Sequence, residues 1–214
     1  MLPFPPICPI RSLRCKVGAS FFIMGKVCQY SNVKETELVD ERTLELLQRS
    51  TKLAVEAVQW GSIQLLMTSY LGRTLPPLDS ITSVRVIVMR ENEILVVRDP
   101  ESVHILPGGR REAGETLLQT LQREMLEETG WTIQNISLLG FKHFHHLTPE
   151  PEDYPYPYPD FFQAIYRAYA NTFIENARDK DGYELEVMYL PIDVVASLAI
   201  SEGERKYIEY IEWL

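Results

Sequence analysis

Residues Gly109–Trp131 read GRREAGETLLQTLQREMLEETGW, a segment that ends in closely spaced acidic side chains. If this segment is helical, Glu127 and Glu128 lie roughly 60° and 40° to either side of Glu124, on one face. Like charges placed so closely destabilise a bare helix. A hard divalent cation such as Mg²⁺ or Mn²⁺ binds oxygen ligands of this kind. The segment therefore predicts a metal site, and the alternative is an acidic helix face that only meets solvent.

The segment resembles the Nudix box, the signature of the Nudix hydrolase family. That signature is Gly, five residues, Glu, seven residues, and then Arg-Glu-aliphatic-x-Glu-Glu-x-Gly-aliphatic. Every specified position is filled here, by Gly109, Glu115, Arg123, Glu124, Glu127, Glu128 and Gly130. Met125 and Trp131 stand where the signature prefers a branched aliphatic residue, a departure that affects packing rather than the acids.

The resemblance implies an α/β fold, a Nudix-like α/β/α sandwich with a mixed sheet, and we expect N-terminal helices added to it. It also implies hydrolysis of the pyrophosphate bond in a nucleoside diphosphate linked to another moiety. ADP-ribose, dinucleotides, nucleotide sugars and nucleoside triphosphates share that bond, so the substrate stays open. The rival hypothesis is a non-catalytic Nudix-fold sensor that binds a nucleotide and regulates a partner. The complete set of acids favours the enzyme.

By the same resemblance, Glu124, Glu127 and Glu128 hold the Mg²⁺ or Mn²⁺ cofactor, together with the backbone carbonyl of Gly108. Bound cations neutralise phosphate and acidify a bound water. One carboxylate, Glu124 or Glu127, then accepts the proton. We expect Arg123, with Glu115, to position this catalytic group, and the alternative is a surface ion pair worth under about 1 kcal/mol.

Two further groups are expected from outside the box. Many relatives supply an additional acid, for which the candidates are Asp160, Asp181, Glu184 and Glu186; Glu184 is preferred by analogy as a metal ligand. Arg98 ends the second expected strand, where several family members place a phosphate-binding arginine. A solvated arginine at a strand end is the alternative.

The segment His143–Asp160 contains three of the four histidines and three Tyr-Pro pairs. Proline favours a stiff, extended path. Tyr156 and Tyr158 could therefore project to one side and stack on a base or sugar, and His145 or His146 could contact phosphate. A zinc site is a competing idea that lacks further spaced ligands. A purely structural loop is the other alternative.

Composition narrows the class of protein. The chain has 214 residues, 45% hydrophobic residues and a net charge of −9. It contains no apolar run near the ~20 residues of a membrane span. The acidic balance argues against a nonspecific binder of nucleic acid polymers, but not against a nucleotide bound through metal ions. The three cysteines, Cys8, Cys15 and Cys28, follow no zinc-ligand spacing, and a reducing, cytoplasmic compartment is expected.

We expect four parts along the chain. Residues 1–36 form a disordered leader. Because residues 1–34 contain arginine but no acid, an organelle transit segment is one alternative, and translation starting at Met24 is another. Residues 37–78 form a helical extension, interrupted near Gly61 and closed by a Pro-Pro linker, which serves core packing or a homodimer contact. Residues 79–200 form the Nudix domain, and residues 201–214 a C-terminal helix. The expected elements from residue 83 onward are strands at Ser83–Met89, Ile94–Val97, Ile105–Gly109, Ile133–Phe144, Phe161–Tyr169 and Glu184–Leu190, and helices at Glu115–Thr129, Pro191–Leu198 and Glu204–Trp213.

Overall fold

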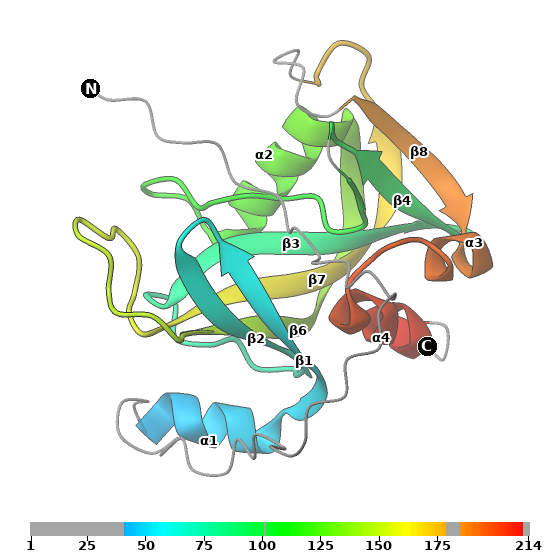
Figure 1. Cartoon of the computed structure of the whole chain (residues 1–214). Helices are drawn as coiled ribbons and strands as arrows, with labels where there is room; N and C mark the ends of the chain where they lie inside the picture. Colours follow the sequence, from blue (N-terminus) through cyan, green and yellow to red (C-terminus); the bar gives the residue numbers. More distant parts are fainter. Residues whose placement is uncertain (1–40, 101, 179–184, 212–214) are drawn as a thin grey trace.

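The computed structural model describes residues 41–100, 102–178 and 185–211 (Figure 1). The predicted 1–36 leader lies outside these residues. The described chain forms one mixed sheet of eight strands, in the order β1-β2-β6-β7-β3-β4-β5, with β8 paired to β4. The strands are β1 Thr51–Trp60, β2 Ile63–Leu71, β3 Ile81–Arg90, β4 Glu93–Arg98, β5 Val103–His104, β6 Trp131–His146, β7 Asp160–Phe173 and β8 Glu186–Pro191. The helices are α1 Glu41–Arg49, α2 Leu117–Thr129, α3 Ile192–Ala196 and α4 Glu202–Ile211.

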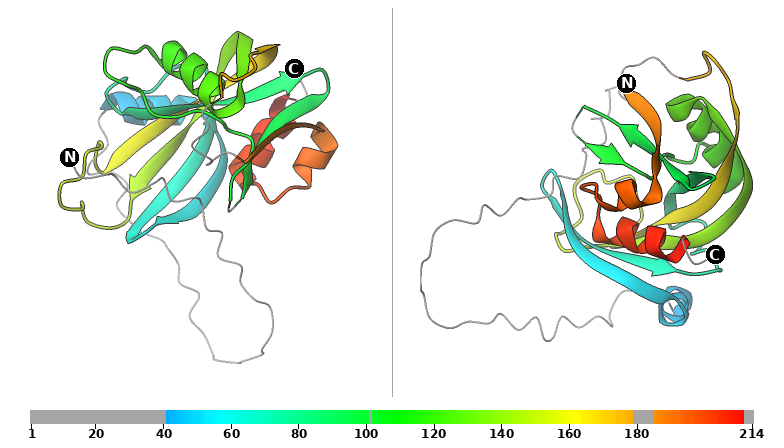
Figure 2. Two further views of the ribbon diagram at one scale, coloured as in Figure 1. Left: turned by 90° about the horizontal axis from the view of Figure 1, so that it is seen from above. Right: turned by 90° about the vertical axis from the view of Figure 1, so that its right-hand side faces the viewer.

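The sheet separates two layers of helices, which confirms the predicted α/β/α arrangement (Figures 1 and 2). β3 runs parallel to β7, and the remaining pairs are antiparallel, so the sheet is mixed. α2 covers one face, where Val84 and Val86 of β3 share a buried cluster with Leu121 and Met125. α3 and α4 cover the other face, where Ile87 is clustered with residues of both helices. β3 is therefore covered on both faces, which explains its nearly continuous apolar sequence.

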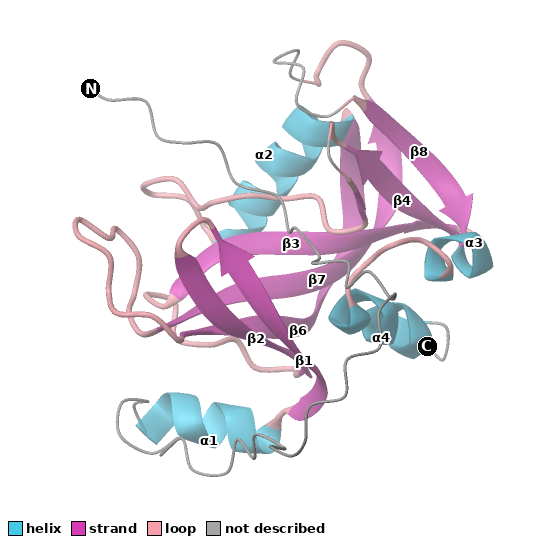
Figure 3. Ribbon diagram, viewed as in Figure 1, coloured by secondary structure: helices cyan, strands magenta, loops and turns pink. Residues whose placement is uncertain are grey.

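The prediction of helices over 37–78 is wrong for most of that range. Among the described residues of that range only α1 is helical, and Thr51–Leu71 forms the antiparallel hairpin β1–β2 (Figure 3). Gly61 does not break a helix; it occupies the hairpin turn with a φ of 59°, a conformation that glycine adopts without a steric penalty. β2 also pairs with β6 along its length. These long-range hydrogen bonds, with β-branched residues in both strands, outweigh the approximate helical spacing of the apolar residues.

The predicted strand Ile105–Gly109 is also wrong, and its irregular path creates the site. The segment runs beside β3, with Val86 N–H donating to Pro107 O (3.1 Å) and Val84 N–H donating to Gly109 O (2.9 Å). Gly108 has a φ of 128°, and a Cβ there would lie 2.3 Å from the Val84 carbonyl oxygen. Only glycine fits such a close approach to backbone. The segment 107–110 is called the glycine loop below.

α4 confirms a C-terminal helix, and two acidic side chains fix it to the sheet. Glu56 of β1 accepts the N–H groups of Glu202 and Gly203 (both 3.1 Å), so it caps the helix start. The buried Lys142 Nζ lies 3.1 Å from Glu204 Oε1. The contacts of Glu56 and Glu204 therefore hold α4 against the sheet. Among the described residues, no helix is long and apolar enough to cross a membrane.

Candidate active site

Both ends of α2 are fixed by local hydrogen bonds. Thr116 and Gln119 form a reciprocal capping box at its start. Gly130 ends it in the left-handed conformation, and its N–H donates to Leu126 O (2.9 Å). Met125 is fully buried in the core, so methionine fills the place of the branched aliphatic residue of the signature. The acidic residues consequently lie on the side of α2 that meets the glycine loop.

Arg123 connects the acidic groups of the site to one another. Its guanidinium donates to both carboxylate oxygens of Glu115 (2.7 and 3.0 Å), to Glu124 (3.0 Å) and to Glu127 (2.9 Å). A further bond reaches Arg110 O in the glycine loop (3.1 Å). The hydrogen bond from Arg123 lowers the pKa of Glu115 to about 2, so this partner stays ionised. Arg123 thus neutralises part of the repulsion within the acid group, which is the geometry expected of a positioning residue.

Two of the predicted metal ligands contact the glycine loop directly. Gly108 N–H donates to Glu128 Oε2 (2.9 Å). A Cβ on Gly109 would lie 2.3 Å from the Glu124 carboxyl carbon, so that carboxylate packs against the bare glycine backbone. Burial raises the pKa of Glu124, although the guanidinium of Arg123 and the charge of Arg85 act in the opposite direction. A buried carboxylate of this kind gains from a nearby cation.

The donor set fits a hard divalent cation in its chemistry. Glu124, Glu127 and Glu128 offer carboxylate oxygens, and the Gly108 carbonyl is not one of the two that bond with β3. Across residues 41–100, 102–178 and 185–211, however, no three acidic, histidine or cysteine side chains are already arranged around a common point for a metal. Glu124 and Glu127 are directed to Arg123, and Glu128 to Gly108. Each of these bonds uses one carboxylate oxygen, and metal binding would bring oxygens of the three residues to a common point.

The predicted acids beyond the box are either paired or outside the described residues. Glu184 and Asp181 fall in the segment that the structure does not describe. Glu186 lies on β8 and pairs with Arg98 on β4, whose Nε and Nη2 are 2.9 and 2.8 Å from Glu186 Oε2. Both side chains are about half exposed. Arg98 thus already has a carboxylate partner, and its role with phosphate stays a prediction.

Two of the three histidines of β6 share one carboxylate on β7. His143 Nε2 and His145 Nδ1 lie 2.6 and 2.9 Å from Asp160 Oδ1. Burial acts to raise the pKa of Asp160, but the hydrogen bonds with both histidines lower it to about 2. Asp160 is therefore an ionised anchor for the histidines. Among the described residues, neither these three side chains nor any other three of the His, Cys, Asp or Glu type are arranged to hold a metal, so the zinc alternative has no support here.

The Tyr-Pro loop between β6 and β7 reaches the glycine loop through one ring. The guanidinium carbon of Arg110 lies 4.8 Å from the ring centroid of Tyr156. Tyr158 is directed elsewhere: its hydroxyl donates to Thr148 O (3.3 Å), and its ring packs against His146. The two rings thus have different surroundings, and Tyr156 is the one that lies beside the box.

Arg85 is a residue of this site that the sequence analysis missed. It lies on β3, half-buried, and its Nη1 lies 3.4 Å from Leu106 O, just before the glycine loop. A single arginine within an apolar strand, SVRVIVM, was the available signal. Long charged side chains are rarely buried without a function or a partner.

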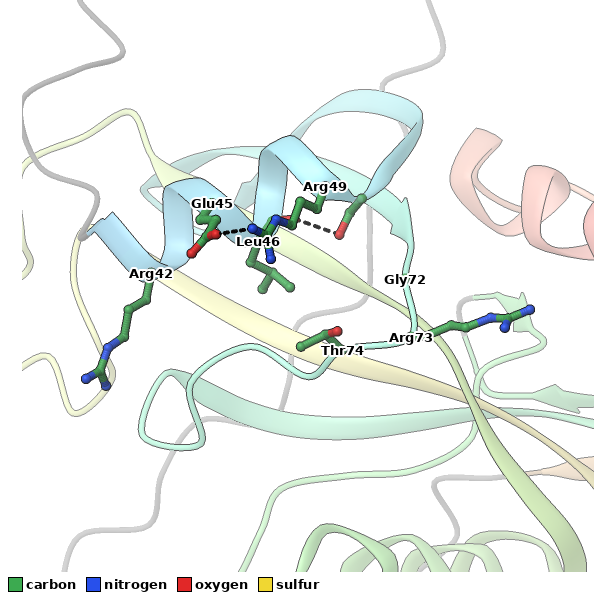
Figure 4. Close-up of a pocket in the computed structure, with 8 residues that line it drawn as sticks. Arg42, Glu45, Leu46, Arg49, Gly72, Arg73 and Thr74 are labelled. Carbon is green, nitrogen blue, oxygen red and sulfur yellow. Dashed lines mark hydrogen bonds and ion pairs between the residues drawn. The ribbon is translucent and has the colours of Figure 1, made fainter.

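A separate hollow of about 180 Å³ lies between α1 and the segment that follows β2 (Figure 4). Arg42, Arg49 and Arg73 line it. Arg49 pairs with Glu45 in the same helix, and the side chains of Arg42 and Arg73 extend in opposite directions (Figure 4). The three cations do not converge, so this hollow is not an anion site, and it is remote from the box.

A family model described as the NUDIX domain matches residues 79–214. The chain belongs to the Nudix family. A comparison with curated proteins finds no match.

Several solved structures are similar to this chain. A NUDIX hydrolase from Nitrosomonas europaea is 18% identical, with 62% of this chain and 89% of that chain covered and a TM-score of 0.49. The Bacillus subtilis pyrophosphohydrolase BsRppH is 19% identical, with 75% and 93% covered and a TM-score of 0.49. The MutT protein from Bacillus halodurans is 23% identical, with 60% and 80% covered and a TM-score of 0.45.

Proposed function

We propose that this chain hydrolyses the pyrophosphate bond of a nucleoside diphosphate linked to another moiety, with Mg²⁺ or Mn²⁺ as cofactor. The observation that carries the proposal is the position of the box carboxylates. α2 holds Glu124 and Glu128 against the glycine loop, and Arg123 binds Glu124 and Glu127 from the other side. Such a concentration of acids suits a polyanionic substrate only if cations lie between them.

Glu124, Glu127 and Glu128 would hold the cation, and the Gly108 carbonyl and Glu184 are the proposed additional ligands. When bound, a divalent cation polarises phosphoryl oxygens and lowers the pKa of a coordinated water. The chain's own carboxylates then have two tasks, to bind and to accept a proton. Glu124 or Glu127 accepts the proton of the attacking water, and Arg123 keeps both in place through its hydrogen bonds.

The substrate is proposed to lie beside the glycine loop, with Arg98 and His145 as phosphate contacts and Tyr156 and Tyr158 as ring contacts. The contact between Arg110 and Tyr156 supports the position of Tyr156. The partners already bound to Arg98, His145 and Tyr158 mean that each would have to exchange a contact for a substrate group.

A nucleotide panel tests the proposal against the non-catalytic sensor. Purified protein is incubated with Mg²⁺ and ADP-ribose, a dinucleotide, a nucleotide sugar or a nucleoside triphosphate, and the products are separated. The enzyme releases a nucleoside monophosphate and a phosphorylated remainder, or pyrophosphate from a triphosphate. Binding of a nucleotide without turnover under any metal condition would favour the sensor.

Two broader expectations stay predictions. The reducing, cytoplasmic compartment was inferred from cysteines that lie outside the described residues. The predicted homodimer contact was assigned to N-terminal helices, and within the described part of that region α1 is the helix that could provide it. Sedimentation of the purified protein measures the oligomeric state.

A further inference from the structure

Arg85 occupies an unusual place for a cation. It lies within β3, flanked by Val84 and Val86, at a strand covered by helices on both faces. Its neighbours in sequence point toward α2, so the alternation of a strand directs Arg85 to the face of α3 and α4, with Ile87. A buried charge is costly unless it is paired or has a ligand.

The glycine loop runs beside this residue in the sheet direction, bonded to Val84 and Val86 on either side of it. A Cβ on Gly108 would be 3.1 Å from the Arg85 Cα, and a Cβ on Gly109 would be 2.3 Å from the Glu124 carboxyl carbon. The backbone of Arg85 therefore lies against one glycine, and the carboxylate of Glu124 against the next. Arg85 and the box carboxylates approach the same short loop from different elements of the fold.

The guanidinium of Arg85 has unused hydrogen-bonding capacity. It carries five N–H donors, and within the described residues its one hydrogen bond is the long contact to Leu106 O (3.4 Å). No carboxylate in the described chain lies within ion-pair distance of it. The acid on the same face, Glu204, is paired with Lys142 (3.1 Å). By contrast, Arg90, on the same strand, is paired with Glu93 (2.7 Å).

The nearest titratable neighbour on β5 does not supply a counter-charge. Burial and the charge of Arg85 lower the pKa of His104 to about 4, so this imidazole is neutral near pH 7. Asp99, which also acts on His104, accepts hydrogen bonds from Ser102 (2.6 and 3.0 Å). The charge of Arg85 therefore acts on the Glu124 carboxylate beside the glycine loop, but the guanidinium forms no ion pair with a carboxylate of the described residues.

We propose that Arg85 binds a phosphate of the substrate, on the side of the glycine loop away from α2. This assignment rests on the proposed pyrophosphohydrolase function and adds a phosphate-binding residue to it. Phosphate matches the planar donor pattern of arginine, which can form two parallel hydrogen bonds.

The test uses inorganic pyrophosphate, the part that all candidate substrates share, and calorimetry with and without Mg²⁺. Arg85→Gln keeps amide donors but removes the charge, and we expect binding to weaken about 10- to 100-fold, the range of a charged hydrogen bond. The KM of the best substrate should rise by a similar factor, with a smaller change in kcat. Arg85→Lys should recover part of the binding because it restores charge without the planar fork. Arg90→Gln, on the same strand, is the matched control and should bind normally.

Pyrophosphate binding by folded Arg85→Gln equal to that of the wild type would overturn the assignment. So would a loss that occurs in Arg98→Gln instead, because Arg98 would then be the phosphate contact. If Arg85→Gln does not fold, Arg85→Lys decides: unchanged binding and KM contradict the proposal. Wild-type turnover is measured separately, so an active enzyme with an unaffected Arg85 variant leaves the proposed function intact. A wild type that neither binds pyrophosphate nor turns over any nucleotide rejects both.

Discussion

Replacing Gly109 by alanine should damage the site while leaving the fold intact. The new Cβ would lie 2.3 Å from the Glu124 carboxyl carbon, whereas non-bonded carbons approach to about 3.5 Å. The carboxylate would have to retreat by about 1.2 Å. It would also lose its present hydrogen bond with Arg123 (3.0 Å). Misplacement by about 1 Å can reduce catalysis about 10²-fold, and we expect turnover to fall by that order.

The backbone conformation at Gly109 predicts that the alanine variant keeps the fold. Gly109, unlike Gly108, does not have a positive φ, so alanine is conformationally acceptable there. The free energy of unfolding should change by less than about 1 kcal/mol, which corresponds to about 2–4 °C in Tm. The assay compares kcat with saturating Mg²⁺ and Tm by calorimetry for the same preparations.

Gly114→Ala is the matched control from the same segment. Its Cβ would meet nothing within 4 Å, but its φ is 88°. The left-handed strain should cost about 1–2 kcal/mol, so this variant should lose stability and keep turnover. Wild-type turnover in a well-folded Gly109→Ala protein would refute the reasoning, because the Glu124 carboxylate would then not need its position against the loop.

Three further changes have separate readouts. Glu128→Gln removes a charge from the acid group, so the metal-free Tm should hold or rise, while Mn²⁺ affinity measured by calorimetry should fall; unchanged affinity contradicts its role as a ligand. Tyr156→Ala should raise KM by the equivalent of about 1–3 kcal/mol if the ring stacks on a base, with kcat and metal affinity unchanged. Tyr158→Ala is measured for comparison, and wild-type kinetics in both variants would make the loop structural only. Asp160→Asn should lower Tm above pH 4, because the folded-state pKa of about 2 is below the ordinary 3.8 and this stabilisation is lost as the pH falls toward 2; a Tm difference that does not shrink over that interval contradicts the pairing with the histidines.

The box helix could be predicted because its determinants are local. Thr116 and Gly130 mark its ends through contacts within four residues, and the acids follow a helical spacing. Apart from Ile105–Gly109, the strands around it were located within a few residues for the same reason, since β-branched runs are bounded by turns.

The hairpin β1–β2 could not be predicted in the same way. Its strands are specified by partners far away in sequence, including the pairing of Leu65 with His146. The apolar residues of Thr51–Leu71 are compatible with either a helical or a strand period, and short apolar runs do not discriminate between them.

The side-chain partners of the predicted substrate-binding residues could not be predicted from the sequence either. Arg98 meets Glu186 and His145 meets Asp160 only because two pairs of strands align in a particular register. Arg85 was missed because its significance depends on the glycine loop that runs beside it. Sequence spacing indicates which residue types are present, but it does not show which charges remain unpaired after folding.

The most direct test of the proposed mechanism compares Mg²⁺-dependent turnover of the best nucleotide substrate in the wild type and in Glu124→Gln. Glutamine keeps the size of the side chain and its helix propensity, but it removes the charge that faces the glycine loop. We expect the wild type to release a nucleoside monophosphate only when the divalent metal is present, and Glu124→Gln to be slower by at least about 10²-fold. Turnover that persists in metal-free buffer, or full activity in Glu124→Gln, would contradict the assignment of the box carboxylates as the metal site.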